Sequence, residues 1–125
     1  MALHVTECAA LHDLAVQAAA RMYEGDGYET LVRHQPLPSL PGATPFDLFV
    51  PTLGRVQEVE TLETLPAVDL GRLRRCRREG LQVWVLVPTE ALSLAHATLK
   101  DAVDHIVPFW ALDGERVRFG QPRRP

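Results

Sequence analysis

Apolar and polar positions in the first part of the chain change from a helical to an alternating period. From residue 5 to 24 apolar residues recur at the spacing of a helix, and Thr6 is suited to cap its start. The sequence "GDG" at 25–27 is expected to end this helix. "YETLVRHQPL" (28–37) then alternates as a strand does, and "PSLPGATP" (38–45) predicts a loop.

Two short apolar runs flanking a turn follow this loop and predict a β-hairpin. The runs are "FDLFV" (46–50) and "RVQEVET" (55–61), joined by "PTLG". Alternation along the first run predicts that Asp47 points away from the face shared by its apolar neighbours, which are Phe46, Leu48 and Val50.

The second half of the chain alternates helices with strands. Pro66 suits the first turn of a helix that extends to about Glu79. The nearly continuous apolar run "LQVWVLVP" (81–88) predicts a strand buried on both faces. A helix over 90–104 and a strand over 105–112 follow. The predicted element order is therefore αβββαβαβ, which indicates an α/β fold with a mixed β-sheet flanked by helices.

Composition agrees with one globular domain and favours no particular partner. The chain has 125 residues, of which 46% are hydrophobic and 23% charged, with a net charge of −3. We expect one domain over 1–125, with 119–125 as a flexible tail. No apolar run approaches the ~20 residues of a membrane-spanning helix, and no secretory leader is evident. The two cysteines, which match no metal or disulfide pattern, indicate a reducing, cytoplasmic location.

Three acids in the predicted hairpin are the strongest chemical signal in the sequence. Glu58 and Glu60 point to the same side of their strand, roughly 6.5 Å apart along the backbone. Hairpin pairing can bring Asp47 beside Glu58. Three neighbouring carboxylates repel one another, and Mg²⁺ or Mn²⁺ bound to their oxygens would remove the conflict. The alternative is an edge strand whose glutamates are simply hydrated.

The order of elements around these acids resembles the PD-(D/E)XK restriction-endonuclease-like superfamily. Asp47 corresponds to the first acid of the motif, Glu58 to the second, and Glu60 to the position that usually holds lysine. The resemblance covers residues 5 to about 110. It implies a fold of the restriction-endonuclease type, a metal ion bound by the acids, and hydrolysis of phosphodiester bonds in DNA. It also implies that an acid on the first helix can complete the metal site, for which the candidates are Glu7, Asp13 and Glu24.

Two departures from the family pattern support a second interpretation. Phe46 separates Pro45 from Asp47, so the literal "PD" pair is absent. Glu60 stands in place of lysine, and a carboxylate does not supply the positive charge that lysine offers a phosphate. The alternative function is therefore a catalytically inactive domain of the same fold that acts as a nucleic-acid-binding or protein-interaction module.

Five arginines in "GRLRRCRRE" (71–79) and two polar residues upstream of the hairpin are secondary candidates. On a helix, Arg74 and Arg78 lie about one turn apart, and with Arg75 they could contact phosphates. Their alternative role is a solvated helix face. His34 and Gln35 belong to the strand expected beside the acids, where they could serve as accessory groups. A homodimer is also expected, because a domain of this size offers little surface for gripping a duplex.

Overall fold

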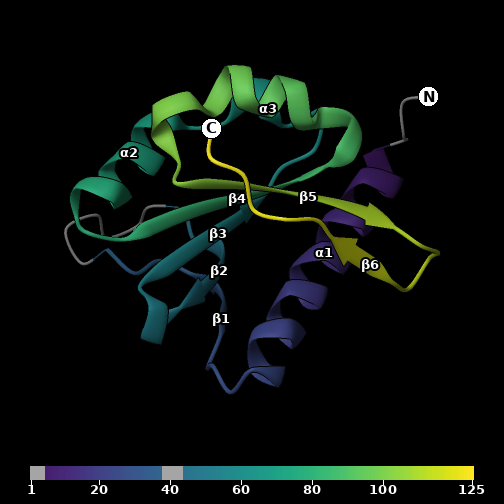
Figure 1. Ribbon diagram of the computed structural model, residues 1–125, viewed down its shortest axis with the longest axis horizontal. Helices are drawn as coiled ribbons and strands as arrows, with labels where there is room; N and C mark the ends of the chain where they lie inside the picture. The colour runs from purple at the N-terminus through teal and green to yellow at the C-terminus, as the bar shows by residue number, and fades with distance from the viewer. Residues whose placement is uncertain (1–4, 38–43) are drawn as a thin grey trace.

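A six-stranded mixed sheet with helices on both faces forms the body of the protein (Figure 1). The computed structural model describes residues 5–37 and 44–125, with side chains from residue 9 onward. Helix α1 (Val5–Gly25) covers one face of the sheet. Helices α2 (Leu70–Arg78) and α3 (Leu92–Leu99) cover the other face.

The strands lie in the sheet in the order in which they occur along the chain. Their bounds are β1 Leu31–His34, β2 Phe46–Val50, β3 Arg55–Val59, β4 Gln82–Pro88, β5 His105–Ala111 and β6 Val117–Phe119. Strands β1, β2 and β3 pair antiparallel, β3, β4 and β5 pair parallel, and β6 returns antiparallel to β5. The predicted α/β class and mixed sheet are therefore confirmed.

Strand β4 is the centre of the fold because it contributes to both layers of core. Val83, Val85 and Val87 are fully buried on the side of α2 and α3. Leu86 is buried in the second cluster, which forms on α1. This burial on both faces is what the continuous apolar run predicted, since side chains alternate along a strand.

Strand β1 is shorter than the alternating pattern predicted. The expected strand over 28–37 is extended only from Leu31 to His34. Arg33 within it has φ +55°, the left-handed region that non-glycine residues rarely adopt. An isolated residue of this kind interrupts the regular pleat, so the alternation of side chains does not continue through it.

The helices also begin and end at other residues than predicted. Pro66 lies in a separate 3-10 turn, Leu65–Ala67, and α2 begins at Leu70. Asp69 caps α2 because its Oδ1 accepts the backbone N–H of Arg72 at 3.0 Å. Helix α3 ends at Leu99 rather than at 104, and a 3-10 turn over Lys100–Ala102 follows it.

The prediction that the apolar residues of β2 share one face is wrong. Phe46 packs in the cluster under α2 and α3, whereas Leu48 packs in the cluster under α1. Asp47 lies between them, where the regular alternation of β2 is broken. The reason lies in the hydrogen bonds of Asp47, described below.

Part of the expected tail, Gly120 to Arg123, runs along β5. The backbone N–H of Gly120 donates to Pro108 O, and Arg123 exchanges two backbone hydrogen bonds with Ile106, all at 2.8 Å.

Among the described residues, no helix combines the length and the apolar character needed to cross a membrane.

We expect Leu73→Ala to lower the free energy of unfolding by about 3 kcal/mol, because it leaves a cavity under α2. Leu73 is completely buried in the cluster that packs α2 against the sheet. The matched control is Leu94→Ala on α3, where the leucine is 37% exposed and the loss should stay below about 1 kcal/mol. Urea unfolding monitored by circular dichroism measures both, and equal losses would contradict the assignment of the core.

Candidate functional site

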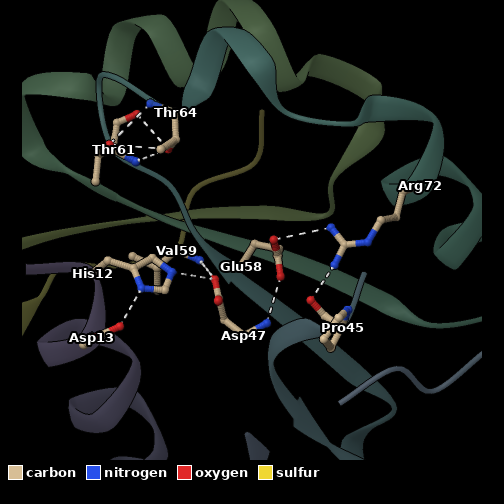
Figure 2. Close-up of polar contacts among 9 residues, drawn as sticks. All are labelled: His12, Asp13, Pro45, Asp47, Glu58, Val59, Thr61, Thr64 and Arg72. Atoms are coloured by element: carbon tan, nitrogen blue, oxygen red, sulfur yellow. Dashed lines mark hydrogen bonds and ion pairs between the residues drawn. The ribbon is translucent and has the colours of Figure 1, made fainter. Parts of the chain in front are cut away.

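The candidate site forms where β2 and β3 separate. The two strands pair through their backbones from Val50–Arg55 to Leu48–Gln57. Beyond that point, hydrogen bonds between a backbone N–H and a side-chain carboxylate join the strands instead. The backbone N–H of Asp47 donates to Glu58 Oε1 at 2.8 Å, and the N–H of Val59 donates to Asp47 Oδ2 at 2.8 Å (Figure 2). Each acid thus accepts a backbone hydrogen bond from the opposite strand. These two bonds explain why the alternation of β2 breaks at Asp47.

The three predicted acids line a single cavity of about 470 Å³. Its lining consists of His12, Arg33, Thr44, Pro45, Asp47, Glu58, Val59, Glu60 and Thr64. Glu58 is only 8% exposed and Glu60 only 9%. Such burial of carboxylates is costly, so the site needs compensating partners.

His12 reaches the site from α1 and is a partner of Asp47. Its Nε2 lies 3.1 Å from Asp47 Oδ2, and its Nδ1 lies 3.1 Å from Asp13 Oδ1 (Figure 2). The hydrogen bond with Asp47 is the main reason that the pKa of His12 is raised from 6.5 to about 9, against the opposing effect of burial. His12 is therefore a cation at neutral pH.

Arg72 reaches the site from α2, on the other side of the sheet, and is the partner of Glu58. Its Nη1 lies 3.4 Å from Glu58 Oε2, and its Nη2 donates to Pro45 O at 2.9 Å (Figure 2). The guanidinium also stacks on Phe46, with Cζ 3.7 Å from the ring centroid. The Arg72 side chain is only 13% exposed, so these contacts hold it in place beside the acid.

Burial and mutual repulsion raise the pKa of two of the acids. Burial is the largest cause for Glu58, whose pKa rises from 4.5 to about 7; the charge of Asp47 adds to the rise and Arg72 opposes it. Burial also raises the pKa of Glu60, and a hydrogen bond with Thr64 opposes that rise. Glu58 can therefore exchange a proton near neutral pH, as acid–base groups at functional sites do.

A pair of threonines forms the turn that directly follows Glu60. Thr61 N–H donates to Thr64 Oγ1 at 2.8 Å, and Thr64 N–H donates to Thr61 Oγ1 at 3.3 Å (Figure 2). Leu65 N–H donates to Thr61 O at 3.0 Å. These local hydrogen bonds form a tight turn shortly after β3. Because of this turn, Glu60 and Thr64 both line the cavity.

Of the two predicted first-helix acids whose side chains the structure describes, Asp13 lies near the site, and it contacts His12 rather than the cavity. Glu24 accepts a hydrogen bond from Thr30 Oγ1 at 2.9 Å, near the end of α1, and does not line the cavity. The side chain of Glu7 lies outside the described residues.

The arginines predicted to bind phosphate lie on the solvent side of α2, and two of them pair with acids. Arg74 Nη2 lies 3.0 Å from Asp101 Oδ1, and Arg75 Nε lies 3.0 Å from Glu79 Oε1. Arg78 is exposed. None of these three lines the carboxylate cavity. Their arrangement matches the solvated helix face that was the alternative interpretation.

The predicted accessory residues do not line the cavity either. The His34 ring stacks on Phe49, with centroids 5.4 Å apart. Gln35 Nε2 donates to Leu37 O at 2.6 Å, and Leu37 N–H donates to Gln35 Oε1. Both side chains therefore serve local structure at the end of β1.

Sequence reasoning missed His12, Arg33 and Arg72. His12 occurs three and seven residues before the buried Ala15 and Ala19, so it interrupts the apolar stripe of α1. That interruption was a usable signal. For Arg72 and Arg33 no comparable signal exists, since their places depend on how α2 and β1 pack.

The carboxylates do not form a metal centre as they stand. Their hard oxygens are the ligand type that Mg²⁺ and Mn²⁺ accept. However, within the described part of the chain no three His, Cys, Asp or Glu side chains converge as ligands of one ion. Both oxygens of Glu58 already contact protein donors, and Asp47 Oδ2 contacts two.

Comparison with protein-family models, with curated proteins and with solved structures found no match to this chain.

We expect the pH dependence of stability to report the burial of Glu58. Because its pKa is about 7 when folded and 4.5 ordinarily, the contribution of Glu58 to stability is complete below pH 4.5 and is lost as the pH rises through 7. Glu58→Gln removes this titration. Between pH 4.5 and pH 7 the unfolding free energy of the variant should therefore fall by about 2–3 kcal/mol less than that of the wild type. Urea titrations across the pH range measure it. The exposed Glu90→Gln is the control and should follow the wild-type curve; a Glu58→Gln curve parallel to wild type would contradict the assignment.

The His12 imidazole should titrate near pH 9 in an NMR titration, because Asp47 stabilises its protonated form. Asp47→Asn should move this pKa down toward 6.5, whereas Asp13→Asn should move it less, since Asp47 is the larger cause. The same linkage predicts that stability due to His12 is complete below pH 6.5 and is lost as the pH rises through about 9. If Asp13→Asn lowered the pKa of His12 more than Asp47→Asn does, Asp47 would not be the main cause of the raised pKa.

Proposed function

We propose that this chain is a restriction-endonuclease-like domain whose carboxylate cavity hydrolyses phosphodiester bonds in DNA. The observation that carries the proposal is that Asp47, Glu58 and Glu60 line one cavity. These are the three positions on which the family resemblance rests. Burying Glu58 and Glu60 there is unfavourable for folding alone, and clusters of perturbed acids are typical of functional sites.

The residues around the cavity have roles suited to this chemistry. Arg33 is exposed and lines the cavity, so its guanidinium can bind a phosphate oxygen. Glu60 can orient the attacking water and accept its proton as one P–O bond forms and another breaks. His12 and Arg72 hold Asp47 and Glu58 in place.

The cofactor proposed for this reaction is Mg²⁺ or Mn²⁺. A phosphate group approaching three carboxylates is repelled, and a divalent cation offsets that repulsion and makes a bound water more acidic. We further propose that the chain acts in the cytoplasm, where thiols stay reduced, and Cys76 is a free, buried cysteine. We also propose a homodimer, because a domain of this size offers little surface for gripping a duplex.

A second candidate function is favoured by the ion pairs themselves. Arg72 and His12 already neutralise Glu58 and Asp47 without a metal ion. In this candidate the domain has lost catalysis and binds nucleic acid or another protein. Binding to DNA would then survive the loss of Asp47 and would weaken steeply with salt if arginines carry it.

A plasmid assay with the purified chain tests the first proposal. Supercoiled plasmid should be nicked or linearised with Mg²⁺ or Mn²⁺ and remain intact with EDTA. Asp47→Asn and Glu60→Gln should each lower the rate by about 100-fold, because each removes a carboxylate from the cavity. Glu24→Gln, which changes an acid outside the cavity, is the control and should cut like wild type.

The remaining outcomes separate the two candidates. Intact plasmid in every metal condition, together with salt-sensitive DNA binding by both wild type and Asp47→Ala, selects the inactive module. Cleavage that persists in Asp47→Asn and Glu60→Gln would mean that a contaminant or another site is responsible. Light scattering coupled to gel filtration on the same samples measures whether the chain is a dimer.

A further inference from the structure

A second cavity, of about 280 Å³, lies between the end of α1, the sheet and the residues that follow β6. Its walls are mainly apolar, because Ala19, Leu86 and Val107 line it together with the aromatic rings of Trp84 and Phe119. Among the described residues, none lines both this cavity and the carboxylate cavity. It is therefore separate from the site described above, and we call it the Trp84 cavity.

Gln57 lines the Trp84 cavity with one end of its amide unpaired. Only 4% of the residue is exposed, and its Nε2 donates to Tyr23 Oη at 3.0 Å. Its Oε1 is buried and has no hydrogen-bond partner within the described part of the chain. A buried acceptor without a partner is unfavourable for folding. A ligand that brings an N–H group to this oxygen would therefore remove a cost that the protein bears alone.

Trp84 provides the complementary group on the next strand. It is the neighbour of Gln57 in the parallel pairing of β3 and β4, and it lines the same cavity. Its indole Nε1–H is a donor, and no described residue accepts a hydrogen bond from it. Neighbouring strands are about 5 Å apart, so one small molecule can reach both side chains. The two unpaired groups therefore select a ligand that has a donor directly beside an acceptor.

The polar wall of the Trp84 cavity is fixed before any ligand arrives. The Arg55 guanidinium stacks on the ring of Trp84, with Cζ 3.7 Å from the centroid. Its Nη1 also donates to Tyr23 Oη at 2.9 Å, the same oxygen that accepts the amide of Gln57. These contacts hold three side chains of the wall in one arrangement. A ligand consequently pays little to order them.

The outer wall is held as firmly, by the residues that follow β6. Gly120 N–H donates to Pro108 O at 2.8 Å, and Gly120 lines the cavity. A Cβ at position 120 would lie only 2.8 Å from Pro108 Cγ, so the absence of a side chain lets this segment approach β5. The cavity is therefore largely pre-formed, as small-molecule sites usually are.

Volume and charge narrow the class of ligand further. At about 280 Å³ the cavity is just below the usual range of about 300–1,000 Å³, which suits a single ring. Among its described lining residues, Asp26 is the only one with a charged side chain. A carboxylate repels an anion, so the lining favours a neutral molecule over one that carries a phosphate.

We propose that the Trp84 cavity binds a neutral, single-ring heterocycle in which an N–H lies beside a C=O, as in a pyrimidine base. Gln57 Oε1 accepts the ligand N–H, and Trp84 Nε1 donates to the ligand carbonyl. The apolar and aromatic walls contact the faces of the ring. This inference goes beyond the proposed function and does not depend on it.

An NMR titration of the full chain with uracil tests the inference. The chain has two tryptophans, so the ¹⁵N-labelled protein gives two indole N–H signals, which Trp110→Phe assigns. The Trp84 signal should shift and saturate with a Kd on the order of 1 mM or tighter, as expected for a ligand with few atoms. The signal of Trp110, which is 43% exposed and does not line the cavity, should stay in place.

A matched ligand and a matched variant isolate the hydrogen bond to Gln57. 1,3-Dimethyluracil keeps the ring and both carbonyls but has no N–H, and it should bind wild type about tenfold more weakly, the scale of one hydrogen bond. Gln57→Met should weaken uracil binding by a similar factor and leave the binding of dimethyluracil unchanged. Gln17→Met, on an exposed position of α1 outside the cavity, should bind uracil as wild type does.

The opposite results overturn the inference. It fails if the Trp84 signal does not move up to the solubility limit of uracil, because water or the protein itself then satisfies the two groups. It also fails if dimethyluracil binds wild type as well as uracil does, or if Gln57→Met keeps the preference for uracil. The comparison of the two ligands on wild type remains decisive even if Gln57→Met does not fold.

Discussion

The exchange of hydrogen bonds between Asp47 and Glu58 is the constraint on which the candidate site depends. Strands β2 and β3 stop pairing through their backbones at Leu48–Gln57, and each acid then accepts a backbone N–H from the other strand. The backbone N–H groups of Asp47 and Val59 therefore keep hydrogen-bond acceptors, although the strands no longer supply backbone carbonyls to them. The cost is that two carboxylates become partly or largely buried side by side.

This arrangement explains why the site draws on both helical layers. His12 comes from α1 on one face of the sheet, and Arg72 comes from α2 on the other. Each supplies one positive charge to one acid. Packing of α1 and α2 against the sheet therefore sets the electrostatics of the cavity, so the core and the site are not independent.

The same ion pairs bear on both proposed functions. If the cations of the chain can be displaced, the carboxylates become available to a metal ion, and the cavity suits hydrolysis of a phosphodiester. If they remain, Asp47 and Glu58 stay paired with His12 and Arg72, and binding by the surface of the domain is the alternative. Arg72 and Glu58 are 3.4 Å apart and both largely buried. How strongly they bind each other is therefore the quantity that distinguishes the two proposed functions.

The sequence by itself determined the α/β class, the hairpin of β2 and β3, and the burial of β4 on both faces, because these follow from periodicity. It also identified Asp47, Glu58 and Glu60, because acids in apolar strands stand out. Only the tertiary structure decided that Phe46 and Leu48 lie on opposite faces and that His12 and Arg72 neutralise the acids. The physical reason is that such contacts join residues 14 to 35 positions apart in the sequence, through packing that no local period records.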